Sequence, residues 1–259
     1  MERRHPAGIA AVTAALHFPG TINEMNGYWI GILAFAPGLF WLWYFYKKDE
    51  LEPEPKALVW RMFFYGMLLV IPCGLIENIL PLSPFTMLIF AAPVIEECAK
   101  FFLVRTTIYR YAEFDEPMDG IVYAAATALG FASLENLGYL ISHQSSVLTI
   151  GDESVYGGTL GLSLSRALLS VPGHVLFSAA WGFALGITKF MDESSKGWIY
   201  VRAGLVISII SHGLFNFLCM APWGAFLLLI FMYSSGRMVK KQILTALMNS
   251  PHAPYDLKD

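Results

Sequence analysis

The stretch LSPFTMLIFAAPVIEECAKFFLVRT, Leu82–Thr106, places two adjacent carboxylates inside a run that is otherwise apolar. A run of this length can cross a bilayer, because about 20 apolar residues span the hydrocarbon core. An ionisable side chain at the centre of such a helix costs roughly 2.5–3.5 kcal/mol, so it usually faces a cavity or a reaction site. We therefore interpret Glu96 and Glu97 as functional residues.

The composition of the chain is that of a membrane protein. Of its 259 residues, 56% are hydrophobic and 14% are charged, against roughly 25% charged in soluble domains. This predicts an all-α, polytopic helix bundle in the lipid bilayer with a central polar cavity. We expect a single domain over residues 1–259, with the motif-bearing core at about 82–220.

Seven apolar runs have the length and composition of transmembrane helices. They are Tyr28–Tyr46, Ala57–Leu80, Leu82–Thr106, Met118–Ser142, Val171–Lys189, Trp198–Met220 and Trp223–Met238. A further run, Ala7–Phe18, has about half a spanning length, so it is either an eighth crossing or an interfacial segment. The connections Lys47–Lys56 and Ala112–Met118 are acidic and contain proline, which predicts solvated loops. The long connection His143–Ser170 is expected to be an external loop that ends in a short helix, Thr159–Leu169.

The charge distribution indicates orientation more than partners. Most Lys and Arg residues fall on one side of the predicted spans, which predicts a cytoplasmic C-terminus by the positive-inside rule. The net charge of −3 and the lack of a basic stripe argue against binding to nucleic acid. The sequence does not indicate an oligomeric state.

The carboxylates of the opening stretch have a lysine close by. Glu96 and Lys100 are four residues apart and share one helical face, whereas Glu97 points about 100° away. A structural ion pair between Glu96 and Lys100 is one interpretation. The other is catalytic, because a desolvated carboxylate beside a like charge becomes a proton acceptor near neutral pH.

A second polar pair, Glu135 and Asn136, lies inside the run Met118–Ser142. Small residues such as Gly120 and Gly130 would let a neighbouring helix approach closely. Asn136 could simply bond two helices together, whereas a buried Glu135 needs a donor such as His or Lys.

Two histidines complete the set of polar residues in apolar runs. His174 follows Pro172-Gly173 at the start of a predicted span, where a histidine at the membrane rim would be unremarkable. His212 and Asn216 are four residues apart on one face. They could donate to an oxyanion or take part in metal binding. Convergence of Glu96, Glu135, His174 and His212 on one cavity is our central expectation.

Four motifs together resemble the PrsW family of intramembrane proteases, which shares a superfamily with the type II CAAX prenyl proteases. They are EECAK at Glu96–Lys100, DGIVYAAATALGFASLEN at Asp119–Asn136, RALLSVPGH at Arg166–His174 and HGLFN at His212–Asn216. They occur in the family's order. Where the prenyl proteases have Phe-xxx-His, this chain has Phe131-xxx-Glu135, which puts the role of Glu135 in question.

The resemblance implies an intramembrane endopeptidase of the bacterial cytoplasmic membrane, performing site-1 cleavage of a single-pass substrate such as an anti-sigma factor. The favoured mechanism is that of a glutamic peptidase without cofactor. In it Glu96, assisted by Glu97, activates water, and His212 and Asn216 stabilise the oxyanion. His174 and Glu135 would then position water or protonate the leaving amine, with Lys100 and Asn136 in support.

Two alternatives stay open from the sequence. One is a zinc-dependent version of the same protease, with Glu96, His174 and His212 as ligands, although no HExxH motif is present. The other is a transporter or scaffold that uses the same buried polar residues without catalysis. A helix broken at Pro93 would favour transport.

Overall fold

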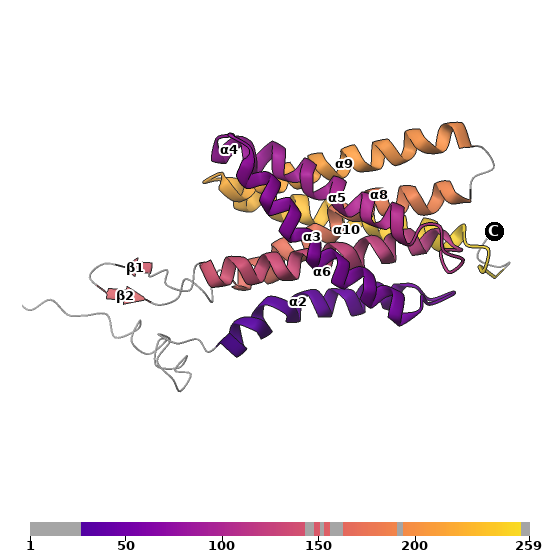
Figure 1. The fold of residues 1–259 in the computed structure, drawn as a ribbon, viewed down its shortest axis with the longest axis horizontal. Coiled ribbons are helices and arrows are strands. Elements are labelled where there is room, and N and C mark those ends of the chain that lie inside the picture. The colour runs from indigo at the N-terminus through magenta and orange to yellow at the C-terminus, as the bar shows by residue number, and fades with distance from the viewer. Residues whose placement is uncertain (1–26, 143–147, 151–152, 156–162, 191–193, 255–259) are drawn as a thin grey trace, which may run out of the picture.

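The computed structural model describes residues 27–142, 148–150, 153–155, 163–190 and 194–254. Within these residues the fold is a bundle of helices (Figure 1), which confirms the predicted all-α class. The short run Ala7–Phe18 lies outside the described residues, so the structure does not bear on an eighth crossing. The long connection between α6 (Pro117–Ser142) and α8 (Val171–Lys189) contains an antiparallel hairpin of β1 (Leu148–Ile150) and β2 (Glu153–Val155).

Each of the seven predicted apolar runs contains a long helix. These are α2 (Gly27–Lys48), α3 (Lys56–Ile79), α5 (Ala92–Thr107), α6 (Pro117–Ser142), α8 (Val171–Lys189), α9 (Ser194–Met220) and α10 (Gly224–Met248). In the described residues, four helical stretches are long and apolar enough to cross a membrane: Gly27–Lys48, Lys56–Ile79, Ser163–Lys189 and Gly197–Met220. The chain is therefore an integral membrane protein, and seven or eight spans remain a prediction. Helix α10 continues ten residues beyond the predicted end of the last apolar run at Met238, to Met248.

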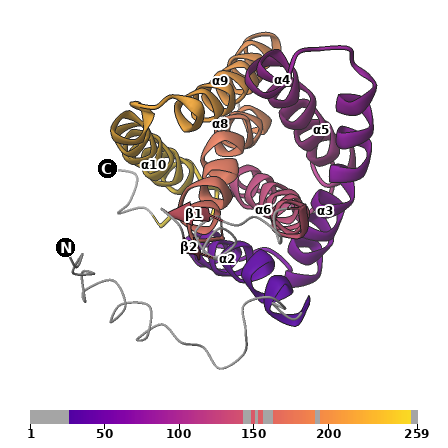
Figure 2. The ribbon, with the colours of Figure 1, turned by 90° about the vertical axis from the view of Figure 1, so that its left-hand side faces the viewer.

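Helices α6 and α8 occupy the middle of the bundle, with α2, α3, α5, α9 and α10 around them (Figure 2). Small residues allow this close packing. A Cβ atom added to Gly130 of α6 would lie 1.8 Å from the Phe63 carbonyl oxygen of α3. One added to Gly120 would lie 2.2 Å from the Gly182 carbonyl oxygen of α8. The small-residue contacts predicted for this run are thus confirmed, and they fix the two helices that carry Glu135 and His174.

Two π-helical turns precede the functional residues of α5 and α8. The turn η2 (Met87–Ala91) follows the single turn α4 (Pro84–Thr86) and runs into Pro93, while η3 (Arg166–Ser170) runs into Pro172. In both helices the proline therefore follows a widened turn, and the helix continues through it. Helix α5 continues through Pro93, so it lacks the break that would have favoured transport. Residues 163–169 of the predicted separate helix Thr159–Leu169 belong to the longer stretch Ser163–Lys189, and residues 159–162 lie outside the described part of the chain.

The two acidic connections are not fully solvated, contrary to the prediction. Asp49 and Glu54, between α2 and α3, are 2% and 0% exposed. Glu116, just before α6, is also buried, and its carboxylate accepts a hydrogen bond from the Ser250 hydroxyl beyond α10. Proline and charge in a connection correctly indicated that it is not helical, but they did not indicate what packs over it.

Candidate active site

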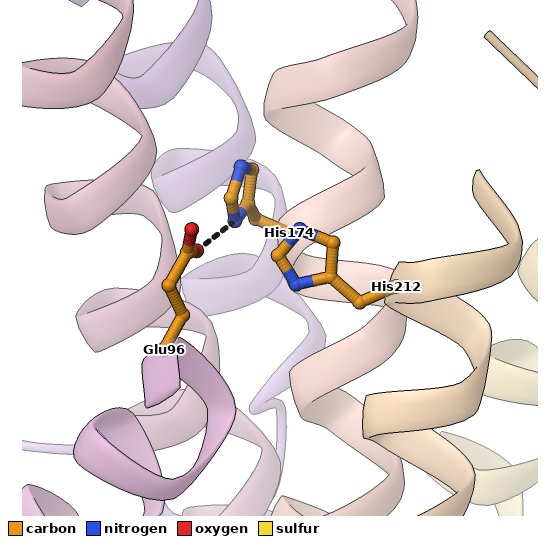
Figure 3. Close-up of side chains that lie close together, drawn as sticks. All are labelled: Glu96, His174 and His212. Atoms are coloured by element: carbon orange, nitrogen blue, oxygen red, sulfur yellow. Dashed lines mark ion pairs between the residues drawn. The ribbon is translucent and has the colours of Figure 1, made fainter. Parts of the chain in front are cut away.

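Three separate helices bring Glu96, His174 and His212 together in the interior of the bundle (Figure 3). One ligand atom from each of the three side chains lies within 4.8 Å of the other two. The residues are 5%, 3% and 4% exposed, respectively. The expected convergence is therefore present, whereas a central polar cavity around it remains a prediction.

Lys100 lies at the centre of this group and is fully buried. Its Nζ donates to Glu96 Oε2 at 3.1 Å and to Glu97 Oε1 at 2.9 Å. It also lies 3.1 Å from His174 Nδ1 and 4.2 Å from the centroid of the Phe131 ring. The ammonium thus balances both carboxylates of the adjacent pair. The expectation that Glu97 points away from Glu96 and Lys100 was wrong.

Glu97 is the most completely bonded carboxylate of the site. Its Oε2 accepts hydrogen bonds from Ser178 Oγ (2.8 Å), Trp181 Nε1 (3.2 Å) and Ser208 Oγ (2.8 Å). Because donors from α8 and α9 surround it, Glu97 holds α5 against both helices.

His174 connects Lys100 to Glu135, and its neighbours define its tautomer. Because an ammonium group only donates, the Nδ1 atom of His174 must be the acceptor toward Lys100. Its Nε2 therefore carries the proton and donates to Glu135 Oε2 at 3.2 Å. The helical stretch that contains His174 begins at Ser163, eight residues before the predicted start at Val171.

Glu135 and Asn136 share Arg166 as their partner from the other side of the site. Arg166 donates from Nη2 to Glu135 Oε2 at 2.7 Å and from Nε to Asn136 Oδ1 at 2.9 Å. The Asn136 amide also donates to the backbone carbonyls of Leu33 and Ala34 at 3.4 and 3.3 Å. Asn136 therefore links helices, while the Glu135 side chain, 22% exposed, is the outermost carboxylate of the site.

Asn216 is engaged with the π-helical turn η2. In a π-helix each carbonyl accepts from the fifth residue onward, so the Leu88 carbonyl would pair with position 93. Since Pro93 has no N–H, Asn216 Nδ2 supplies the bond instead, at 2.8 Å. A contribution of Asn216 to an oxyanion site stays a prediction.

Sequence reasoning missed Trp181 and Ser208, and it gave no role to Arg166 or Ser178. Helical spacing contained a signal for most of them. Ser178 and Trp181 follow His174 by four and seven residues, so they share its helical face. Ser208 precedes His212 by four residues and shares the face of that histidine. No comparable spacing identifies Arg166 as the partner of Glu135.

The donor set suits a metal ion of the zinc class. Catalytic zinc sites use three nitrogen and oxygen ligands from the protein and leave one position for water. His212 Nδ1 is buried without a hydrogen bond of good geometry, although Glu97 Oε1 is 3.3 Å away. The hydrogen bond from His174 to Glu135 is the outer-shell contact that typically orients a metal-binding histidine. The residues present therefore fit such an ion.

A membrane-embedded centre of Glu and His residues, fixed by a second layer of donors, defines a hydrolase-type site within an integral membrane protein. Residues 54–238 match the model of the PrsW family of intramembrane metalloproteases. The chain belongs to this family and is an intramembrane protease.

Curated relatives support this membership over most of the chain. The match to a PrsW protease of Geobacillus kaustophilus is 39% identical over 199 residues, which is 74% of this chain and 81% of the relative. The match to one of Bacillus subtilis is 36% identical and covers 72% and 80% of the two chains. The match to one of Clostridioides difficile is 28% identical and covers 80% and 86%. No solved structure matches the chain.

Proposed function

We propose that the chain is a metal-dependent intramembrane protease, with Glu96, His174 and His212 as the ligands of a zinc-class ion. The observation that carries this proposal is the approach of three ligand atoms, from three helices, to within 4.8 Å of one another in a buried site. The metalloprotease description of the family supports it. The zinc-dependent alternative from the sequence thus has better support than the cofactor-free mechanism.

A bound zinc-class ion would supply Lewis acidity and lower the pKa of a coordinated water. The protein's own residues would do the rest. Glu135 would keep the proton of His174 on Nε2. The Nδ1 atom, which accepts from Lys100 in this structure, would bind the ion in place of that hydrogen bond. Lys100 would hold the positions of Glu96 and Glu97 while excluding water from their far side.

Proton transfer at the site falls to Glu135 in this proposal. It is the site carboxylate with the largest exposed fraction, 22%, and it already receives hydrogen bonds from Arg166 and His174. Glu97 is unsuited to this task, because its two oxygens are occupied by donors. Glu135 could take a proton from water and pass it to the leaving amine, as general acid–base groups do.

The substrate class is also part of the proposal. Since the site is enclosed by helices that lie in the bilayer, the substrate would be a membrane-anchored protein. Cleavage of a single-pass anti-sigma factor follows from the family resemblance alone. Location in a bacterial cytoplasmic membrane, with the C-terminus in the cytoplasm, rests on that resemblance and on the positive-inside rule.

Metal analysis coupled to activity tests the proposal. The purified protein would be reconstituted in proteoliposomes with a single-pass anti-sigma factor reporter, and zinc content, cleavage and proton flux would be measured together. We expect about one zinc per chain, loss of cleavage on chelation and recovery on zinc addition. Full cleavage by metal-depleted protein would instead support the cofactor-free mechanism based on Glu96. Proton flux without cleavage would support transport.

A further inference from the structure

A second group of carboxylates lies at the end of the bundle where α2 meets α3 and where α6 begins (Figure 1). We call it the acidic cluster, and it consists of Asp49, Glu54, Glu116 and Asp119. The four residues are at most 2% exposed. Oxygen atoms of Asp49, Glu116 and Asp119 lie within 4.8 Å of one another. The proposed protease mechanism does not use any of them.

One oxygen of each carboxyl group has a hydrogen-bond donor that fixes its position. Asp49 Oδ2 accepts from the Glu54 backbone N–H at 2.9 Å, and Asp119 Oδ2 accepts from the Glu116 backbone N–H at 2.8 Å. Glu54 Oε2 accepts from the Tyr123 hydroxyl at 2.5 Å. Glu116 Oε2 accepts from the Ser250 hydroxyl. The cluster thus joins the α2–α3 connection, the start of α6 and the segment after α10.

The second oxygen of each group is buried and has no hydrogen-bond partner. These atoms are Asp49 Oδ1, Glu54 Oε1, Glu116 Oε1 and Asp119 Oδ1. Glu54 does not belong to the group of Asp49, Glu116 and Asp119 whose oxygens lie within 4.8 Å of one another. It is fully buried, and its carboxyl group lies beside that of Asp119. Buried polar atoms are normally satisfied. Asp49 lies within hydrogen-bond reach of Glu116, and Glu54 of Asp119, so each contact between two acids requires either a shared proton or a bound cation.

The protein itself does not supply such a cation in the part of the chain that is described. No ion pair joins these four carboxylates to a Lys, Arg or His side chain there. Lys189 of α8 is the cation whose charge acts on Asp119 and Glu54, but its Nζ donates to the Tyr109 and Phe114 backbone carbonyls. The other groups nearby, Asp115 and Glu52, are themselves acidic.

We propose that the acidic cluster binds a hard divalent cation of the Mg²⁺ or Ca²⁺ class. These ions prefer ligand sets made only of oxygen, including carboxylates and water. The cluster offers four carboxylate oxygens and no nitrogen or sulfur ligand. The ion would act as a structural clamp between the α2–α3 connection and α6, at a site separate from the Glu96, His174 and His212 centre.

Calorimetry and thermal unfolding of the detergent-purified full chain at pH 7.5 test this proposal. Chelator-treated protein carrying Glu96→Gln would be titrated with MgCl₂ and, in a second experiment, with CaCl₂, so that the protease centre does not contribute. We expect saturable binding of one ion per chain and a rise in the unfolding temperature on the order of 5 °C at saturation. The ion that binds more tightly identifies the preferred cation.

Matched variants assign the binding to the cluster. Glu54→Gln keeps an acceptor for Tyr123 but removes a charged ligand, and we expect it to weaken binding by at least about tenfold. Glu50→Gln removes one charge from the same connection at an exposed position and should bind like the parent protein. If Glu54→Gln does not fold, Glu116→Gln replaces it. Absence of saturable binding of both ions, or equal binding by the cluster variant and Glu50→Gln, would overturn the proposal.

Discussion

The protein buries carboxylates in two places, and the partners that balance their negative charge differ between the two. At the candidate active site, Glu96, Glu97 and Glu135 face Lys100, Arg166 and two histidines, so each negative charge has a cationic or hydrogen-bonding partner. In the acidic cluster, four carboxylates face one another, and half of their oxygens lack a partner. Burial alone therefore does not define the role of an acidic side chain. Its role depends on the hydrogen-bond donors and cations that surround it.

The largest effect should come from a change to the first region. We expect Glu96→Gln to reduce cleavage of the single-pass reporter by at least about 10²–10⁴-fold, because it removes a ligand or a proton acceptor. The carboxamide nearly preserves the shape, so the helical content and the unfolding temperature should stay close to those of the parent. A reporter assay beside circular dichroism checks both. Cleavage at the parental rate would remove Glu96 from the mechanism.

Loss of the central cation should strongly destabilise the first region. Lys100→Met leaves Glu96 and Glu97 buried without their ammonium partner, at a cost of roughly 3–5 kcal/mol in the free energy of unfolding. Unfolding in mixed micelles with increasing SDS measures this value. Lys47→Met removes an exposed lysine and serves as the control. Equal stability of the two variants would show that the charge balance at Lys100 is not structurally important.

The acidic cluster should show the opposite response to pH from that of carboxylates with cationic partners. Burial raises the pKa of Asp49 and of Glu54 to about 8, from ordinary values of 3.8 and 4.5. The folded state therefore binds extra protons. The resulting stabilisation is complete below about pH 4 and is lost as pH rises through about 8.

In chelator, we expect this loss to be on the order of 4 kcal/mol for each of the two groups between pH 5 and pH 8. Unfolding curves between pH 5 and pH 9 measure it, with a matched series in saturating Ca²⁺ or Mg²⁺ expected to be flatter. Asp49→Asn should reduce the slope in chelator. An unchanged slope in that variant would mean that other groups dominate the pH dependence.

The smallest effect concerns the support of the first region. Asn216→Ala leaves the Leu88 carbonyl without its donor and should lower the free energy of unfolding by about 1 kcal/mol. Asn249→Ala removes a similar bond, to the Thr245 carbonyl, at an exposed helix end and should cost less. If Asn216→Ala reduces cleavage far more than the measured loss of stability explains, then the Asn216 amide acts on the substrate as well.

The sequence was sufficient for the all-α class and for the convergence of Glu96, His174 and His212, whereas their catalytic roles stay a prediction. Hydrophobic run length located the helices, since lipid imposes one simple pattern on every span. Ionisable residues inside those runs indicated Glu96, Glu135, His174 and His212, because the cost of burying them demands a reason. The family resemblance then gave their order.

The sequence was not sufficient where contacts between distant segments decide the outcome. Asp49 and Glu54 lie in a connection rich in charge and proline, which is typical of an exposed loop, and only the packing of α6 and the segment after α10 buries them. Similarly, the partnership of Arg166 with Glu135 joins residues from different helices. Local periodicity carries no information about such contacts.

The widened turns before Pro93 and Pro172 have a consequence for chain length. A π-helical turn contains one residue more than the α-helical turn it replaces, so deleting a single residue from Met87–Ala91 would restore ordinary winding. Because the extra residue is accommodated within that one turn, the residues before it would keep nearly the same orientation relative to Glu96, whereas a deletion in an ordinary α-helical turn would rotate them by about 100°. The same holds for Arg166–Ser170 and His174. At these two places the protein should tolerate the loss of a single codon better than elsewhere in the same helices.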